Sequence, residues 1–294
     1  MNSERDADVI LSRRYQLFYS EETLETLSGD ETSPFIFAAA MRLRGWFPGT
    51  VIKHMKLGRI SAIFRYPVKS MAGESLDSAR LGWHGVEGDR RFAFRRLTDT
   101  SGFPFLTAGK LPQLLLYKPF SEGGNGAASL PTHVRTPEAR EYELRSVELC
   151  EDISIRHGSA VELMNLKSGI FDEAAISVIT QSTVQYLERE SARAIDPRRF
   201  RPNIVIETDI DEPFTENRWV GQTLTFGEDD DRASVNIYMK DVRCVVVNLD
   251  PDTAEKDAAV MNTVSRLNEN CAGVYGTVVG AGELRVGQIV TLRE

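Results

Sequence analysis

Apolar and polar residues alternate along several short stretches of the chain, a two-residue period that is typical of half-buried β-strands. In the first half, Ile60, Ala62 and Phe64 alternate with polar residues, and residues 91–97 follow the same pattern. Residues 114–117 form a short apolar run. Further strands are expected at residues 203–207, 224–226, 235–238, 244–247, 275–279 and 289–292. Residues 282–290 read as a hairpin that closes a sheet.

Two segments of the second half have the spacing of amphipathic helices. Residues 182–193 follow a possible capping region at Thr180 and Ser182. Apolar residues between 259 and 271 recur at helical spacing after Asp257, a possible N-cap, and this places Cys271 on the apolar stripe of the helix. Glycine and proline turns separate the short strands. The pattern predicts a mainly β protein, a β-barrel with inserted helices.

Composition narrows the class of protein. The 294 residues suffice for two modest domains, and a net charge of −8 argues against a general nucleic-acid binder. No apolar run approaches the ~20 residues that span a bilayer, so we expect no membrane partner. The three cysteines cannot form a disulfide framework, which favours a reducing compartment and a cytoplasmic protein. An anionic ligand would therefore need a local basic cluster.

Several familiar sites are absent from the sequence. The four histidines show no metal-binding spacing, and no C-x-x-C pair is present. The chain also lacks a dinucleotide fingerprint, a P-loop and a G-x-S-x-G elbow. These absences leave three short segments that combine a strand with basic or hydroxyl groups.

The first two segments offer cations at the ends of strands. Lys69 and Ser70 can bind a phosphate through an ammonium, a hydroxyl and backbone N–H groups, although a plain proline turn with a solvated lysine is the simpler alternative. Arg90 can form a two-pronged contact with an anion, or it can simply pair with Asp89 in a glycine turn.

The third segment has two parts. Arg201 and Asn203 flank a proline and offer donors, and Arg243 and Cys244 follow some forty residues later. A cysteine among valines is usually a buried small hydrophobe. In a strand Arg243 would point away from the Cys244 face, so a reactive thiolate would need another cation, and Arg201 is the candidate.

Taken in order, these segments resemble the MOSC family, which includes the C-terminal domain of molybdenum-cofactor sulfurase and the mitochondrial amidoxime-reducing components. The motifs are Tyr-Pro-Val-Lys-Ser, Gly-x-x-Gly-Asp-Arg, Phe-Arg-Pro-Asn, and Arg-Cys followed by Asp-Pro-Asp-Thr. The resemblance covers residues 59–294. It implies a MOSC-type β-barrel with inserted helices at 171–294, preceded by a smaller β-barrel-like N-terminal module at 58–170. Residues 1–57 carry no motif and are an extension of unknown role.

The resemblance also implies a molybdenum–molybdopterin cofactor with Cys244 as the catalytic thiolate that binds the metal, and a soft metal suits a thiolate. The residues that it implies around the pterin and its phosphate are Lys69, Ser70, Arg90, Arg201, Asn203 and Arg243. One motif departs from the family, because Gly109 stands where relatives often have arginine in Thr-Ala-Arg.

The activity that the resemblance implies is reduction of small N-hydroxylated compounds. Three cysteines are too few for an iron–sulfur cluster, so we expect a separate electron-transfer protein as the redox partner. Three alternatives remain open: a non-catalytic carrier of the cofactor, a sulfur-carrier protein with a persulfide on Cys244, and a β-barrel interaction module without chemistry.

Overall fold

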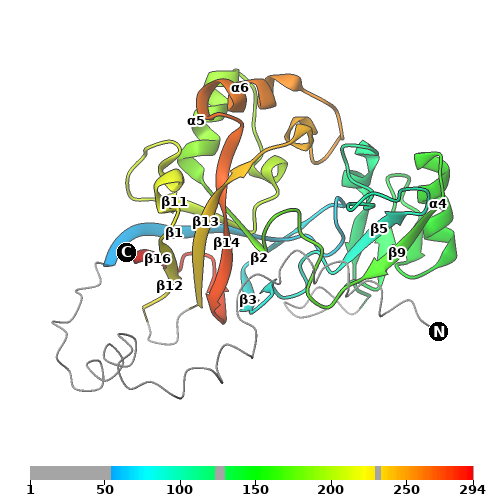
Figure 1. The fold of residues 1–294 in the computed structure, drawn as a ribbon, viewed down its shortest axis with the longest axis horizontal. Coiled ribbons are helices and arrows are strands. Elements are labelled where there is room, and N and C mark those ends of the chain that lie inside the picture. Colours follow the sequence, from blue (N-terminus) through cyan, green and yellow to red (C-terminus); the bar gives the residue numbers. More distant parts are fainter. Residues whose placement is uncertain (1–53, 123–129, 229–232, 294) are drawn as a thin grey trace, which may run out of the picture. The chain divides into compact units, whose positions relative to one another are not determined.

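The computed structural model describes residues 54–122, 130–228 and 233–293, and within these segments the chain is mainly β (Figure 1). Seven strands form a closed ring in which each strand pairs with the next and β11 pairs back with β1. β10 and β11 run parallel, whereas the other pairings of the ring are antiparallel. In ring order the strands are β1 (His54–Arg65), β11 (Ile204–Thr208), β10 (Ile176–Thr180), β14 (Cys271–Gly280), β13 (Ala233–Val242), β12 (Thr223–Phe226) and β16 (Ile289–Arg293).

Aliphatic side chains from every strand fill the barrel. Ile60, Ile176, Ile204, Leu224 and Val274 are buried in one cluster, as the alternation along the strands requires. β2 (Glu74–Leu76) extends the sheet beside β1. The structure confirms the predicted mainly β barrel.

The short strands between residues 74 and 165 lie outside the ring. They are β3 (Ser78–Gly82), β4 (Gly85–Val86), β5 (Phe92–Arg96), β6 (Lys118–Phe120), β7 (His133–Arg135), β8 (Glu141–Glu143) and β9 (Val161–Asn165). With η1 (Pro112–Leu116) and α4 (Val147–His157) they enclose a second core that contains Phe92, Phe94 and Leu149. β15 (Gly282–Arg285), near the end of the chain, pairs with β3. β1 overlaps the start of the predicted N-terminal module, but its pairing with β11 and β16 makes it part of the large barrel.

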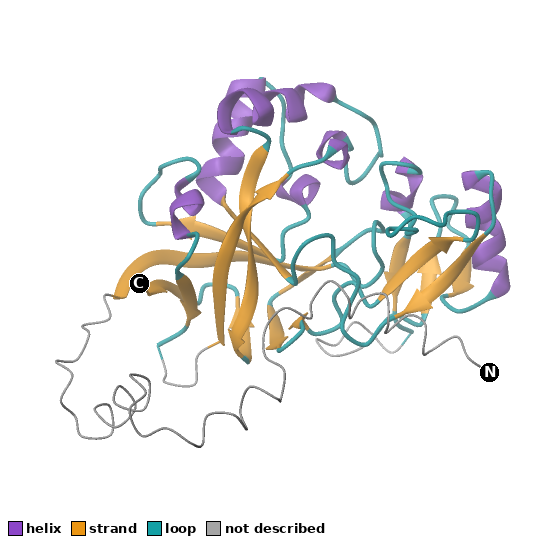
Figure 2. Ribbon diagram, in the orientation of Figure 1, coloured by secondary structure: helices purple, strands orange, loops and turns teal. Residues whose placement is uncertain are grey.

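The remaining helices connect and cover the barrel strands (Figure 2). They are α5 (Gln181–Ser191), α6 (Ala258–Asn268), η2 (Pro197–Phe200), η3 (Thr215–Trp219) and η4 (Val245–Asn248). Thr180 caps α5 by accepting from the N–H of Thr183, and Asp257 caps α6 by accepting from the N–H of Ala259. Both sequence-predicted helices are confirmed, and their apolar faces pack on a cluster that includes Val184, Leu187, Val260 and Val264.

Three expectations about local structure were wrong. Residues 244–247 do not continue a strand, because the pairing of β13 with β14 ends at Val242 and the chain then turns into η4. Cys271 lies on β14 rather than on α6, which ends at Asn268. Residues 282–290 are not a hairpin, since β15 pairs with β3 whereas β16 pairs with β1 and β12.

Two further elements were not anticipated. The apolar run at 114–117 falls in and just after η1, which begins at Pro112, and α4 was missed altogether. Residues 1–53, most of the predicted extension, lie outside the described residues. In the segments that are described, no helix has the length and apolarity needed to cross a bilayer.

Candidate functional site

Hydrogen bonds to backbone carbonyls bring the three basic segments together. The N–H of Lys69 donates to the carbonyl of Phe92 at 2.8 Å, and the N–H of Arg90 donates to the carbonyl of Tyr66 at 2.8 Å. The Arg90 guanidinium then reaches the third segment, where Nη2 donates to the carbonyl of Arg201 at 3.0 Å. Positions far apart in the sequence thus form one cluster at the end of β1.

A buried carboxylate organises this cluster. Asp89 is 1% exposed; Oδ1 accepts from the N–H of Tyr66 at 2.6 Å and Oδ2 accepts from Nδ2 of Asn203 at 3.1 Å. The same carboxylate pairs with Arg90. Burial opposes the charge of Arg90, but Asp89, together with Tyr275 and Tyr66, raises the pKa of Arg90 above its ordinary value. The Asp89–Arg90 pair considered as the simpler alternative therefore exists.

The amide of Asn203 is engaged within the protein. Besides the bond to Asp89, its Oδ1 accepts from the N–H of Ser177 at 3.1 Å. Asn203 is fully buried. Its amide therefore fixes the turn that carries Arg201.

Lys69 is also paired. Its ammonium, 4% exposed, lies 2.7 Å from Oδ1 of Asp172 and 5.2 Å from the centre of the Phe103 ring. Burial lowers the pKa of Lys69, and Asp172 opposes that shift. Because an ammonium carries three donors, Lys69 can hold Asp172 and a second acceptor together.

Three of the candidate residues have left-handed backbones. Ser70, Arg90 and Arg201 have φ values of 66°, 48° and 49°. Such values are uncommon outside glycine and concentrate where a structure must present particular groups to a ligand. Six other non-glycine residues of the described chain share this conformation, so the backbone marks tight turns here and does not by itself identify a site.

Arg201 differs from the other cations of the cluster. Its Nη1 donates to the carbonyl of Met71 at 2.8 Å, but Nη2 is buried without a partner in the described structure, and no carboxylate there forms an ion pair with it. The guanidinium carbon lies 4.2 Å from the centre of the Tyr66 ring, and Arg90 lies 5.0 Å from the same ring. Burial lowers the pKa of Arg201 to about 10. Arg201 is therefore a cation that no carboxylate of the described residues contacts as an ion pair.

The Tyr66 hydroxyl also lacks a hydrogen-bond partner. Tyr66 is 1% exposed, and its Oη has no hydrogen-bond partner in the described structure. Burial raises the pKa of Tyr66 to about 12. The phenol therefore stays protonated and can donate to an acceptor beside Arg201.

The side chains of Arg243 and Cys244 lie in different environments, as expected for neighbours that point away from each other. Arg243 is buried, and its Nε and Nη1 donate to the carbonyls of Ala272 and Phe200, each at 2.6 Å. It also pairs with Asp241 at 2.7 Å. Cys244 is exposed and precedes η4, so it is not the buried small hydrophobe that its valine neighbours suggest.

Cys244 is the exposed cysteine among the three, since Cys150 is partly buried and Cys271 is buried. The bond from Arg243 to Phe200 joins the turn that carries the Cys244 thiol to the segment that carries Arg201. Gly109 lies beside this turn, because a Cβ there would be 3.8 Å from a methyl of Val245.

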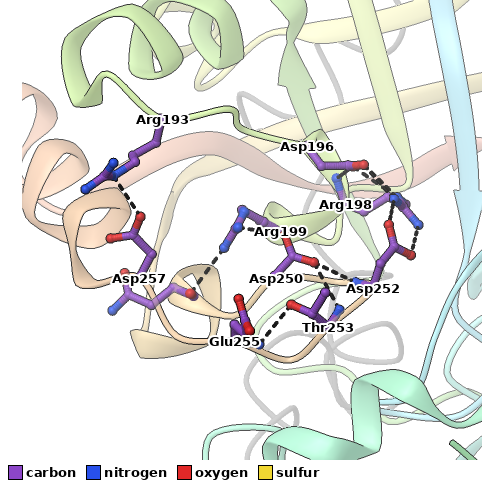
Figure 3. Close-up of polar contacts among 10 residues, drawn as sticks. Arg193, Asp196, Arg198, Arg199, Asp250, Asp252, Thr253, Glu255 and Asp257 are labelled. Carbon is purple, nitrogen blue, oxygen red and sulfur yellow. Dashed lines mark hydrogen bonds and ion pairs between the residues drawn. The ribbon is translucent and has the colours of Figure 1, made fainter.

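A second set of contacts fixes the Asp-Pro-Asp-Thr segment (Figure 3). Arg198 bonds to both Asp196 and Asp252, with shortest distances of 2.6 Å. Arg199 donates to Asp250 at 2.8 Å and to the carbonyl of Asn248 at 3.1 Å. Sequence reasoning missed this anchor, although two arginines directly before Phe200 were a visible signal.

The described residues contain no group of three or more His, Cys, Asp or Glu that could hold a metal ion. A metal at Cys244 would therefore need most of its ligands from a bound cofactor or from solvent.

These features define a mainly β protein with a closed barrel, a second core of short strands, and an exposed cysteine tied to a buried basic cluster. Residues 57–170 match the model of the MOSC N-terminal beta barrel domain, and residues 156–291 match that of the MOSC domain. The chain belongs to the MOSC family, whose domains are associated with molybdenum-cofactor-binding proteins.

Solved structures show more distant likeness. A crystal structure of the YUAD protein from Bacillus subtilis has 12% identity and a TM-score of 0.46, with 83% of this chain and 99% of that chain covered. A crystal structure of a hypothetical protein has 12% identity and a TM-score of 0.38, with 81% and 68% covered. No curated protein matches the chain.

Proposed function

We propose that this protein binds the molybdenum–molybdopterin cofactor and reduces small N-hydroxylated compounds in the cytoplasm, with electrons from a separate electron-transfer protein. One observation carries the proposal. The exposed Cys244 thiol stands on a turn that Arg243 joins to Phe200, the residue that precedes Arg201, and Nη2 of Arg201 has no partner in the described structure.

The residues present fit such a cofactor. Nη2 of Arg201 and Oη of Tyr66 are buried donors without partners, and they suit an anionic group such as a phosphate. Lys69 would add an ammonium from the same cluster. Cys244 offers the thiolate that a soft metal prefers. When bound, the cofactor would supply a metal centre able to accept electrons and to remove oxygen from a substrate nitrogen.

The protein's own part in this function is to bind and orient. Asp89 fixes Arg90 and Asn203, and Asn203 in turn fixes the left-handed turn at Arg201. Arg243 is held by two carbonyls and Asp241, so the exposed Cys244 next to it projects from a rigid support. Rigid support of this kind preserves the geometry of a ligand site.

The exposed thiol also favours a second candidate, a sulfur carrier with a persulfide on Cys244, which requires no molybdenum. A non-catalytic cofactor carrier would use the same site as the enzyme. Metal analysis of protein from a cofactor-producing host separates the sulfur carrier from the other two. Turnover of an amidoxime with an artificial electron donor separates the enzyme from the carrier.

Cys244→Ser tests the proposal directly. A hydroxyl is a poor ligand for a soft metal, so the variant should lose most of its molybdenum. Because the thiol is exposed, the melting temperature should stay close to that of the wild type. Molybdenum is measured by mass spectrometry and the fold by thermal melting.

Cys150→Ser and Cys271→Ser serve as matched controls and should retain the metal. Cys271 is buried at the start of β14, so a loss there should be one of stability. A folded Cys244→Ser protein with undiminished molybdenum would rule out the ligand assignment.

A further inference from the structure

Two arginines hold the turn that carries Cys244 from its opposite ends. The thiol itself forms no hydrogen bond with a described residue, so its position depends on the backbone around it. Before the cysteine, Nη1 of Arg243 donates to the carbonyl of Phe200 at 2.6 Å. After it, Nη1 of Arg199 donates at 3.1 Å to the carbonyl of Asn248, the last residue of η4. Because Arg199 and Phe200 are consecutive, one short segment holds both ends of the turn.

Arg199 also fixes the segment that follows η4. Its Nη2 donates to Oδ2 of Asp250 at 2.8 Å (Figure 3). The other oxygen of that carboxylate accepts from the N–H groups of Asp252 and Thr253 at 3.0 and 3.1 Å. The Arg199 side chain is 8% exposed. A guanidinium presents its N–H donors in a rigid fork, so this buried arginine sets the position of the Asn248 carbonyl relative to the Asp250 carboxylate.

The neighbouring arginine bonds to the same segment without reaching η4. Arg198 pairs with Asp196 and Asp252, each at 2.6 Å, and its side chain is 34% exposed. In the described structure that side chain bonds to these two carboxylates and to no atom of η4. Arg198 and Arg199 are therefore a matched pair, in which both tie down the Asp-Pro-Asp-Thr segment but only Arg199 is bonded to the cysteine turn.

Burial fixes only the second half of the turn. Val247 and Asn248 are buried, whereas Cys244 is exposed and Val245 is 56% exposed. The Asn248 carbonyl also accepts from the N–H of Asp257 at 2.8 Å. Loss of the Arg199 bond should therefore loosen the turn without unfolding it.

We propose that Arg199 is a positioning residue for Cys244, which fixes the turn from its far end and so holds the exposed thiol in one orientation. Arg199 acts through the backbone, because its guanidinium bonds to Asn248 and Asp250 and not to the thiol. The inference rests on the proposed function for the metal that the thiol meets. The fixing of the turn needs no cofactor and can be measured without one.

The first measurement is hydrogen exchange in the full chain, purified from a host that makes no cofactor. The reporters are the amides of Val247 and Leu249, whose N–H groups bond within the turn. Arg199→Gln should speed their exchange about ten-fold or more, because a charge-assisted hydrogen bond that keeps the turn closed is lost. Amides of β10 should change less. Arg198→Gln is the matched control and should leave Val247 and Leu249 as in the wild type.

The second measurement is the molybdenum retained per folded protein from a cofactor-producing host. Asp250→Asn removes the ion pair but keeps the bond from Arg199 to Asn248, so it reproduces the loss of stability without releasing η4. Arg199→Gln should retain clearly less molybdenum than Asp250→Asn, and Arg198→Gln should retain as much as the wild type.

Unchanged exchange of Val247 and Leu249 in Arg199→Gln, or equal acceleration in the turn and in β10, would overturn the inference. Equal metal loss in Arg199→Gln and Asp250→Asn would do so as well, because general stability would then explain the loss. A wild-type protein that acquires no molybdenum would refute the proposed function instead, and the exchange measurement would still decide whether Arg199 fixes the turn.

Discussion

Replacing Asp89 by asparagine should destabilise the protein more than any surface change. The carboxylate is 1% exposed and receives hydrogen bonds from the N–H of Tyr66, from Asn203 and from Arg90. An amide has one acceptor oxygen, and its NH₂ group would face these donors. The change would also leave Arg90 buried without its counter-ion.

Removing one partner of a buried ion pair costs about 3–5 kcal/mol. For a domain of this size, each kcal/mol lowers the melting temperature by about 2–4 °C, so we expect a fall of about 6–20 °C. Thermal melting followed by circular dichroism measures it. Glu212→Gln is the control, because Glu212 pairs with Arg218 on the exposed surface and its loss should leave the melting temperature almost unchanged.

An Asp89→Asn variant that melts together with the wild type would refute the view that this carboxylate organises the cluster. Equal losses in Asp89→Asn and Glu212→Gln would refute it as well, because burial would then have no part in the effect.

The remaining predictions concern the barrel strands beside the site. In Gly273→Ala the new Cβ would lie 2.6 Å from the carbonyl oxygen of Val178, whereas Gly287→Ala has the same left-handed backbone with open space around it. Urea unfolding should show a loss of about 1–2 kcal/mol for Gly287→Ala and a clearly larger one for Gly273→Ala, and equal losses would contradict this. Burial raises the pKa of Asp241 from 3.8 to about 6, so between these pH values the folded state binds a proton that the unfolded chain releases. The stability of the wild type relative to Asp241→Asn should therefore fall as pH rises through this window, by up to about 3 kcal/mol, and a difference that does not vary with pH would contradict it.

Local patterns predicted much of the fold. The strand around Ile60 and the caps at Thr180 and Asp257 depend on neighbours in the sequence, and the structure confirms each. A register shift between Ile60 and Ala62 breaks the predicted alternation, so Ile60 lies in the barrel core and Phe64 in the cluster under the helices. The missed helix α4 had comparable signals, since Ser146 caps its start and Gly158 ends it in the left-handed conformation.

Other elements depend on contacts that the sequence does not reveal. The valines after Cys244 have high β propensity, but β14 begins at Cys271 and offers no partner beyond Val242. The chain therefore turns into η4, and that turn leaves Cys244 exposed. β15 has the alternation of a hairpin strand, but β3, which lies about two hundred residues earlier, is its actual partner.

The motifs identified the cations of the site, but their counter-ions could not be predicted in the same way. Lys69 pairs with Asp172, which lies 103 residues away, and only the folded chain brings the two together. Asp89 is adjacent to Arg90, so that pair could be anticipated from the sequence. Of the four candidate cations in the sequence, three form ion pairs in the structure, and Arg201 forms none with the described carboxylates.

This difference in pairing changes what a substitution at each cation measures. Removing Lys69 or Arg90 would also leave Asp172 or Asp89 without its partner, so any loss of anion binding would be mixed with a loss of stability. Removing the Arg201 guanidinium releases no carboxylate from an ion pair, because none in the described structure is paired with it. A change in anion affinity in an Arg201 variant would therefore not be mixed with the loss of an ion pair between described residues.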